Sequence, residues 1–253
     1  MEGWTLLQLA TLGIAGLLAG FVNTLAGGGS LVTLPALLLL GLPADVANAT
    51  NRVGVLAQSL VAARGLGRAE SLPGSQIAWI VVPSLLGSLV GAWVAARLPA
   101  SVLKPVLVTT LVLIAVTMLW RPEALVPASG ATPRDPSARP AALLGLFAIG
   151  VYGGFLQAGV GIFLLLFLGG VLRYDLVLGN ALKSLLVAAL TAVALVVFVV
   201  EGEVWWTPGL LLSLTTVLGA QLGVHFALRR GQDAIRKVVF VAVIASCIAA
   251  ALR

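Results

Sequence analysis

The stretch Asn23-Thr24-Leu25-Ala26-Gly27-Gly28-Gly29-Ser30 interrupts a long apolar region near the start of the chain. Residues 4–22 before it and 31–42 after it are almost entirely apolar, so we expect the interruption to lie inside a membrane. Each of the consecutive glycines weakens a helix by about 1 kcal/mol relative to alanine. Irregular backbone at membrane depth survives only where it lines a cavity or is buried in protein. The sequence therefore predicts a broken helix, which we interpret as half of a substrate site.

The composition is that of a polytopic membrane protein. Of the 253 residues, 60% are hydrophobic and only 9% are charged, and the mean hydropathy is +1.12. The net charge is +6, but the basic residues are scattered among apolar segments and form no patch. We therefore expect them to report topology at helix ends, and we expect no nucleic-acid partner. The single cysteine, Cys247, excludes an intramolecular disulfide and a multi-cysteine metal site.

About ten apolar segments follow one another along the chain and predict an all-α fold. They span roughly 5–25, 28–42, 46–64, 76–96 and 101–120 in the first half, and roughly 141–158, 160–172, 175–200, 207–228 and 237–252 in the second. The second segment of each half is shorter than the about 20 residues that a crossing needs, so we expect a half-helix after a break. Whether 28–42 and 160–172 cross fully is left open.

Five prolines and five charged residues between 121 and 140 predict a water-exposed linker between the halves. We therefore expect a first helical membrane repeat over 1–120, a cytoplasmic Pro-rich linker over 121–140 and a second repeat over 141–253. The halves match residue by residue with one two-residue deletion, which indicates duplication. The matched pairs are Gly16/Gly150, Gly20/Gly154, Gly27/Gly159, Gly29/Gly161, Asn48/Asn180, Gly87/Gly219, Gly91/Gly223, Arg97/Arg229 and Lys104/Arg236.

Loop charges predict how the repeats are oriented. Basic residues concentrate at 229–237, where we expect a cytoplasmic loop, whereas 201–207 carries Glu201 and Glu203 with no basic residue and is expected outside. With a cytoplasmic linker and an odd number of crossings in each half, the two repeats have inverted topology. This arrangement places Arg97 and Lys104 on the outer side, against the usual charge bias, and both termini outside as well.

Under inverted topology the two glycine breaks meet near the midplane. The first is Gly27-Gly28-Gly29-Ser30, and its degenerate counterpart is Gly159-Val160-Gly161. The helices that begin after them direct positively polarised N-termini at the same place, which suits an anion. Asn23 and Gln157 precede the breaks at matching positions, where each can donate to a substrate oxygen or hydrogen-bond between helices. The alternative for the breaks is close helix packing through small residues.

A second constellation lies on the long segments after the breaks: Asn48, Asn51 and Arg52 in the first half, and Asn180 and Lys183 in the second. Arg52 and Lys183 are about seven or eight residues into their helices, roughly 10 Å deep at 1.5 Å per residue. Charges at that depth cost a few kcal/mol and seldom persist without a function or a partner. Two cations, amides and two helix N-termini describe an anion site. The alternative is snorkelling, or a structural pair with Asp45 or Asp175.

Three stretches resemble the TauE/SafE sulfite exporter family of bacterial and archaeal membrane proteins. They are "GLLAGFVNTLAGGGSLVTLPALLLLGLPADVANATNR", the weaker echo "GVYGGFLQAGVGIFLLLFLGGVLRYDLVLGNALKS", and "LGAQLGVHFALRRGQDAIRKVV". The resemblance covers nearly the whole chain, and the glycine motif before Pro35 and the second-half "GNALKS" are its most specific parts. It implies a multi-pass permease of the inner membrane, built as a duplicated unit, that moves small sulfur-containing anions such as sulfite and sulfonates.

The sequence therefore predicts a secondary transporter that exports a small anion of the sulfite or organosulfonate type by alternating access at a midplane site. Its expected partners are the anionic substrate and the lipid bilayer, and a homodimer is left open. An anion channel and a non-transporting membrane subunit remain the alternatives. We expect no enzymatic activity, no cofactor and no metal, because the sequence shows no nucleophile–base pair, no metal-ligand cluster and no phosphate-binding loop.

Overall fold

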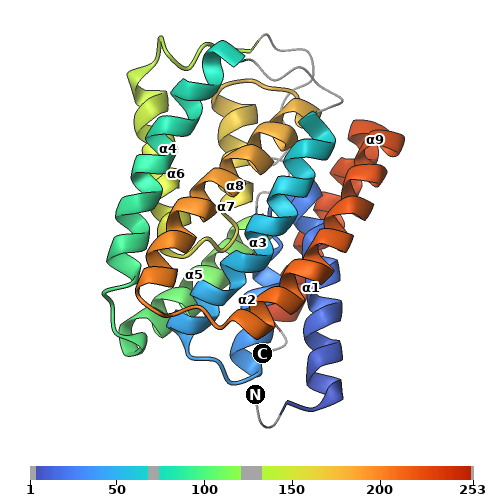
Figure 1. Cartoon of the computed structure of the whole chain (residues 1–253). Coiled ribbons are helices and arrows are strands. Elements are labelled where there is room, and N and C mark those ends of the chain that lie inside the picture. The colour runs from blue at the N-terminus through green and yellow to red at the C-terminus, as the bar shows by residue number, and fades with distance from the viewer. Residues whose placement is uncertain (1–3, 68–73, 121–132, 252–253) are drawn as a thin grey trace.

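A computed structural model describes residues 4–67, 74–120 and 133–251, and every regular element in that part is a helix (Figure 1). The elements are α1 (Leu6–Ala26), α2 (Ser30–Leu39), α3 (Ala44–Gly67), α4 (Gly74–Ala95), α5 (Ala100–Trp120), α6 (Pro140–Phe155), α7 (Val160–Leu166), the π-helical turn η2 (Phe167–Val171), α8 (Leu176–Val200) and α9 (Trp206–Ala251). The all-α class is confirmed for these residues. Most of the expected linker, residues 121–132, lies outside the described residues.

The expected segments match the helices to within a few residues as far as α8, but the last two do not stay separate. Residues 207–228 and 237–251 belong to one continuous helical element, α9, so the loop expected at 229–237 is wrong. The segment contains no proline, and its arginine, lysine, glutamine and alanine residues are good helix formers, although Gly231 and Asp233 are not. Figure 1 shows that α9 begins at the end of the molecule where the chain also finishes, so α9 changes direction along its length.

Each half of the chain contains a helix that stops inside the molecule. α1 ends at Ala26, and α2 leads back to the end of the molecule where α1 began (Figure 1). α6 ends at Phe155, and α7 with η2 leads back to the opposite end, where α6 began. The two broken helix pairs therefore enter the fold from opposite ends.

Four helical segments in the described residues are long and apolar enough to cross a membrane: Leu6–Ala26, Gln76–Ala95, Leu176–Val200 and Trp206–Arg230. α3 is not one of them, although its 24 residues would suffice in length. It is too polar, because it carries Asn48, Asn51, Arg52, Gln58 and Ser59, and each of these side chains is buried against other helices. α3 is thus a polar helix that the apolar helices shield.

The outer faces of the peripheral helices are apolar. On α9, Leu210, Leu214, Leu218 and Leu222 recur every four residues and are each about half exposed or more. Such a continuous apolar stripe would be unfavourable in water, and it matches the acyl chains of a bilayer. The fold is therefore that of a membrane protein, with its polar residues inside.

Glycines allow two helix pairs to approach until their backbones touch. On the α1–α9 seam, a Cβ at Gly20 would overlap the carbonyl of Thr216. On the α4–α6 seam, a Cβ at Gly154 would overlap the carbonyl of Ser88. Gly87, Gly91, Gly150 and Gly219 make equally close contacts on the same two seams, and Gly223 makes a somewhat looser one. Each seam joins a helix of the first half to a helix of the second half, so the two halves pack tightly against each other along both seams.

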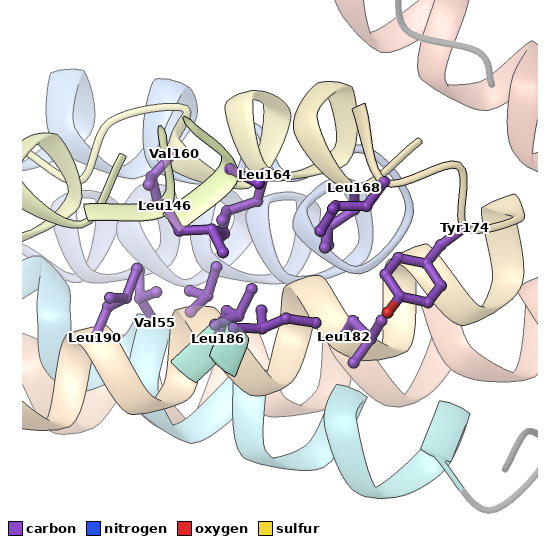
Figure 2. Close-up of a cluster of buried hydrophobic side chains, with 13 residues drawn as sticks. Val55, Leu146, Val160, Leu164, Leu168, Tyr174, Leu182, Leu186 and Leu190 are labelled. Carbon is purple, nitrogen blue, oxygen red and sulfur yellow. The ribbon is translucent and has the colours of Figure 1, made fainter. Parts of the chain in front are cut away.

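The short α7–η2 segment is anchored by a buried apolar cluster. Figure 2 shows Val160, Leu164 and Leu168 directed toward Leu182 and Leu186 of α8. All these side chains are buried. Burying a leucine stabilises a fold by about 1.5–3 kcal/mol, which lets a helix of only seven residues persist. The cluster thereby holds the second break in place.

Candidate functional site

Asn23 and Gly27 shape the first break. Gly27 ends α1 in the left-handed region at φ 80°, where glycine is favoured because it has no Cβ. Its N–H donates to the Asn23 carbonyl at 2.9 Å. The Asn23 side chain accepts from the N–H of Gly29 at 3.2 Å. Asn23 thereby ties the end of α1 to the start of α2 at Ser30.

The second break contains a residue in an unfavourable backbone conformation. Gln157 has φ 62° and Gly159 has φ 67°. The left-handed region costs a non-glycine residue roughly 1–2 kcal/mol, so surrounding contacts must hold Gln157 there. Its Oε1 accepts from Arg52 at 2.8 Å, and its Nε2 donates to the hydroxyl of Thr191. The glutamine side chain therefore joins the break to both α3 and α8.

The two breaks are in direct backbone contact. A Cβ built on Gly27 would lie 2.6 Å from the Gly161 Cα and 2.7 Å from the Ile162 nitrogen. A Cβ built on Gly161 would lie 2.5 Å from the Gly27 Cα. Only glycine at both positions permits this approach, which brings the first turns of α2 and α7 to the same place. Gly28 packs beside the same junction, with a built Cβ 3.5 Å from the Ile162 side chain.

Arg52 of α3 binds the C-terminal end of the broken helix α6. Its Nη1 donates to the Gly153 carbonyl at 3.0 Å, and its Nη2 donates to the Gly154 and Phe155 carbonyls at 2.6 and 3.3 Å. The last carbonyls of a helix lack partners within the helix and carry about half a negative charge. The ring of Phe198 lies 4.7 Å from the guanidinium carbon. Arg52 therefore compensates the exposed helix end, although its side chain is fully buried.

Lys183 of α8 makes the corresponding contact with α1. Its Nζ donates to the carbonyls of Asn23 and Thr24 at 2.6 and 2.9 Å, and to Asn180 Oδ1 at 2.9 Å. Asn180 in turn donates to the Leu176 carbonyl at 3.0 Å. Each cation thus binds the broken helix of the other half of the chain.

Neither cation forms the structural pair with an aspartate that the sequence left open. Asp175 caps α8 by accepting from the Val177 and Leu178 N–H groups at 2.9 and 3.0 Å. Asp45 accepts from its neighbour Val46. The partners of Arg52 and Lys183 are carbonyl and amide oxygens, which are neutral dipoles, so the two positive charges are not cancelled by direct contact with a carboxylate. The centre of the fold is therefore electropositive.

Amides and hydroxyls complete the polar interior beside the first break. Asn51 Nδ2 donates to Ser30 Oγ at 3.1 Å, and Thr33 Oγ1 donates to Asn51 Oδ1 at 2.5 Å. Asn48 Nδ2 donates to the Phe155 carbonyl at 2.9 Å. The residues predicted for the site are all buried and distribute around the contact between the breaks: Asn23, Gly27, Gly28, Gly29, Ser30, Asn48, Asn51, Arg52, Gln157, Gly159, Gly161, Asn180 and Lys183.

A family model described as "Sulfite exporter TauE/SafE" matches residues 12–250. The chain belongs to the TauE/SafE family. A relative named "Probable membrane transporter protein YfcA" from Escherichia coli K12 is 30% identical over 237 residues, covering 93% of this chain and 86% of its own. "Probable membrane transporter protein ORF9" from Sinorhizobium sp. is 30% identical over 242 residues, covering 95% and 91%. A Haemophilus influenzae "Probable membrane transporter protein" is 27% identical and covers 92% and 90%. No solved structure matches the chain.

These comparisons confirm the resemblance and identify the protein as a membrane transporter of this family. The sequence reasoning missed three residues that the fold brings to the site. Thr191 holds Gln157, Phe198 covers Arg52, and Glu203 lies within electrostatic range of Arg52. Thr191 follows Asn180, Ser184 and Val187 at helical spacing on α8, a signal that was available in the sequence. Nothing in the sequence relates Glu203 to Arg52.

Proposed function

We propose that this TauE/SafE member is a secondary transporter that exports small oxyanions of sulfur, sulfite or organosulfonates, by alternating access. The observation that carries the proposal is the contact between Gly27 and Gly161, where two helix breaks meet among buried polar groups. Discontinuous helices that meet at the interface between repeats are a usual construction of transporter sites. Buried polar groups of this kind can replace the hydration of an anion with fixed donors.

Charge supports an anionic substrate. Arg52 and Lys183 bring two positive charges to the interior and hydrogen-bond only neutral oxygens. α2 and α7 begin at the junction, and the start of a helix carries a positive partial charge. Ser30 and Asn51 add a hydroxyl and an amide at the same place. A sulfonate, with three acceptor oxygens and one negative charge, fits this donor set.

We further propose that residues 1–120 and 141–253 are inverted-topology repeats that rock around this junction. The broken helices enter from opposite ends of the fold, which supports the inversion (Figure 1). Arg52 binds the end of α6, and Lys183 binds the end of α1. These contacts support a cycle in which the two halves move against each other, while the cation of each half stays bound to the broken helix of the other half. All site residues are buried, which corresponds to an occluded state.

The proposed location is a bacterial or archaeal inner membrane, crossed several times. At one end of the molecule lie the basic residues Arg134, Arg139 and Arg173, near the start of α6 and α8. At the other end lies the loop with Glu201 and Glu203 (Figure 1). Because basic loops stay in the cytoplasm, we place the arginine-rich end inside.

Ligand-dependent stabilisation tests this function. The melting temperature of the purified protein in detergent should rise with sulfite and methanesulfonate, and should not rise when only the cation of the salt is varied. In proteoliposomes, sulfonate flux should saturate and respond to a gradient, whereas a channel would give flux that does not saturate. No stabilisation and no flux with any anion would refute the proposal and favour a non-transporting subunit.

Variants assign the role of the two cations. Arg52→Gln and Lys183→Gln should each reduce sulfonate affinity at least tenfold, because each removes one positive charge from the centre. Arg97→Gln is the matched control, since Arg97 stacks 4.0 Å from the Trp93 ring at the periphery and should leave affinity unchanged. Variants that fold, as judged by their melting temperature, and transport normally would exclude a substrate role for these residues.

A further inference from the structure

Buried polar atoms without a hydrogen-bond partner gather along one helix. Among the described residues they are Asn48 Oδ1, Arg52 Nε, Gln58 Oε1, Ser59 Oγ and Glu203 Oε2, and the first four lie on α3. Leaving such an atom unpaired costs about 1–3 kcal/mol, so these atoms are rarely left without a reason. Three of them, on Asn48, Arg52 and Glu203, belong to residues that surround one place.

That place is the end of α3 that faces the loop between α8 and α9. Asp45, Asn48 and Arg52 are spaced at i, i+3 and i+7, so they share one face of α3. Trp205 donates its N–H to Thr50 Oγ1 at 3.0 Å, which holds the loop against α3. This stripe of three side chains therefore leads from the loop to the buried centre.

Glu203 lies beside this stripe. Its N–H donates to the Phe198 carbonyl at 3.0 Å, and the Phe198 ring covers the guanidinium of Arg52 at 4.7 Å. Both Asp45 and Arg52 act on the carboxylate through space, although neither hydrogen-bonds to its buried oxygen. The carboxylate is thus close enough to sense the charge of Arg52, yet it is not locked to it in an ion pair.

We propose that Glu203 is the proton-binding site that couples proton movement to anion transport, acting through the stripe formed by Asp45, Asn48 and Arg52. This inference rests on the proposed function and adds the coupling ion to it. When Glu203 is ionised, its negative charge opposes an anion near Arg52. When the carboxylate takes up a proton from water, the repulsion disappears and the full field of Arg52 acts on the anion.

The electrostatic surroundings of Glu203 suit this role. Burial, together with the carboxylates of Asp45 and Glu201, raises the pKa of Glu203 to about 7, against the opposing effect of Arg52. These are the charged groups that face it from α3 and from its own loop. Phe198 of α8, whose carbonyl accepts from the Glu203 N–H, is not titratable. The carboxyl group therefore gains and loses its proton near physiological pH.

The test is the pH dependence of methanesulfonate binding, because this ion keeps one negative charge from about pH 5 to 9. Affinity of the full-length protein, measured by thermal shift in detergent, should fall about fivefold or more across that range. In Glu203→Gln, which resembles the protonated side chain, affinity should stay high at every pH. Glu201→Gln is the matched control in the same loop, where Glu201 is exposed. Its affinity should still fall as pH rises, with the midpoint moved to lower pH, because the Glu201 carboxylate contributes to the raised pKa of Glu203.

A second measurement separates coupling from binding. Proteoliposomes loaded with a pH-sensitive dye should show proton movement driven by a methanesulfonate gradient in the wild type and in Glu201→Gln. Glu203→Gln should still exchange methanesulfonate but move no protons. Wild-type binding without pH dependence, or a Glu203→Gln protein that keeps the wild-type profile, would overturn the role of Glu203 alone. Absence of binding at every pH would refute the proposed function and this inference with it.

Discussion

Replacing Gly27 by alanine tests the contact between the two breaks. The substitution has two separable costs. An alanine at φ 80° in the left-handed region costs about 1–2 kcal/mol. Its Cβ would also lie 2.6 Å from the Gly161 Cα, so the backbones must move apart, and relieving such overpacking typically costs about 1–3 kcal/mol. We therefore expect Gly27→Ala to lower the free energy of unfolding by about 2–5 kcal/mol.

The chain offers controls for each cost. Gly41 has φ 89° but nothing within 4 Å of a built Cβ, so Gly41→Ala should show the backbone cost alone, about 1–2 kcal/mol. Gly161 does not have a positive φ, so Gly161→Ala should show the steric cost alone. Equilibrium unfolding in mixed micelles at increasing dodecyl sulfate compares the three variants.

The unfolding free energies of the three variants together test whether the two breaks are in contact. If Gly27→Ala costs no more than Gly41→Ala, the breaks are not in contact and the proposed site does not exist in this form. If the double variant Gly27→Ala/Gly161→Ala costs less than the sum of the single variants, the two glycines share one contact, as we expect.

Three further predictions concern the cation, the loop carboxylate and a helix seam. Lys183→Met should lower the free energy of unfolding by about 2–4 kcal/mol in the same assay, because it removes the Lys183 donor from the buried Thr24 carbonyl and from Asn180 Oδ1, while the Asn23 carbonyl keeps the Gly27 N–H. The exposed Lys104→Met should change it by less than about 0.5 kcal/mol. Because the pKa of Glu203 is raised from its usual 4.5 to about 7, the folded state holds the proton more tightly, so stability should decline as pH rises from about 4.5 to 7. That part of the decline should be absent in Glu203→Gln, and a decline of unchanged size would contradict the assignment. Gly154→Leu should separate α4 from α6 and lower the melting temperature. Gly170→Ala is the control and should leave the melting temperature unchanged, because nothing lies within 4 Å of a built Cβ. Equal melting temperatures for the two variants would show that the α4–α6 seam is loosely packed.

The helices and the two breaks were predictable because their signals are local. An apolar run of about 20 residues predicts a crossing, and glycines in its middle predict a break. The matched glycines also pointed to the seams, since Gly87 and Gly91 lie on one and Gly219 and Gly223 on the other. The continuity of α9 was missed because charged residues were interpreted as a loop, although arginine and lysine favour helix and α9 stays helical where it changes direction.

The partners of the buried cations were not predictable. Depth in the helix correctly placed Arg52 and Lys183 in the interior, but the sequence offered Asp45 and Asp175 as the nearest charges. The structure instead gives them the carbonyls at the ends of α6 and α1, far away in the chain. Carbonyls are present at every residue, so a sequence pattern cannot single out which of them a broken helix will leave without a partner.

The broken stretch around Gly27 follows from the sequence alone, because three glycines between apolar runs cannot continue a stable helix in a bilayer. The family likewise follows from residue order, and the same order predicts the duplication. Three relations depend on tertiary packing. They are the contact of Gly27 with Gly161, the binding of Arg52 and Lys183 to the broken helix of the opposite half, and the position of Glu203 near Arg52. These relations join residues far apart in the chain, and they arise only when buried helix ends and charges must satisfy each other in a space without water.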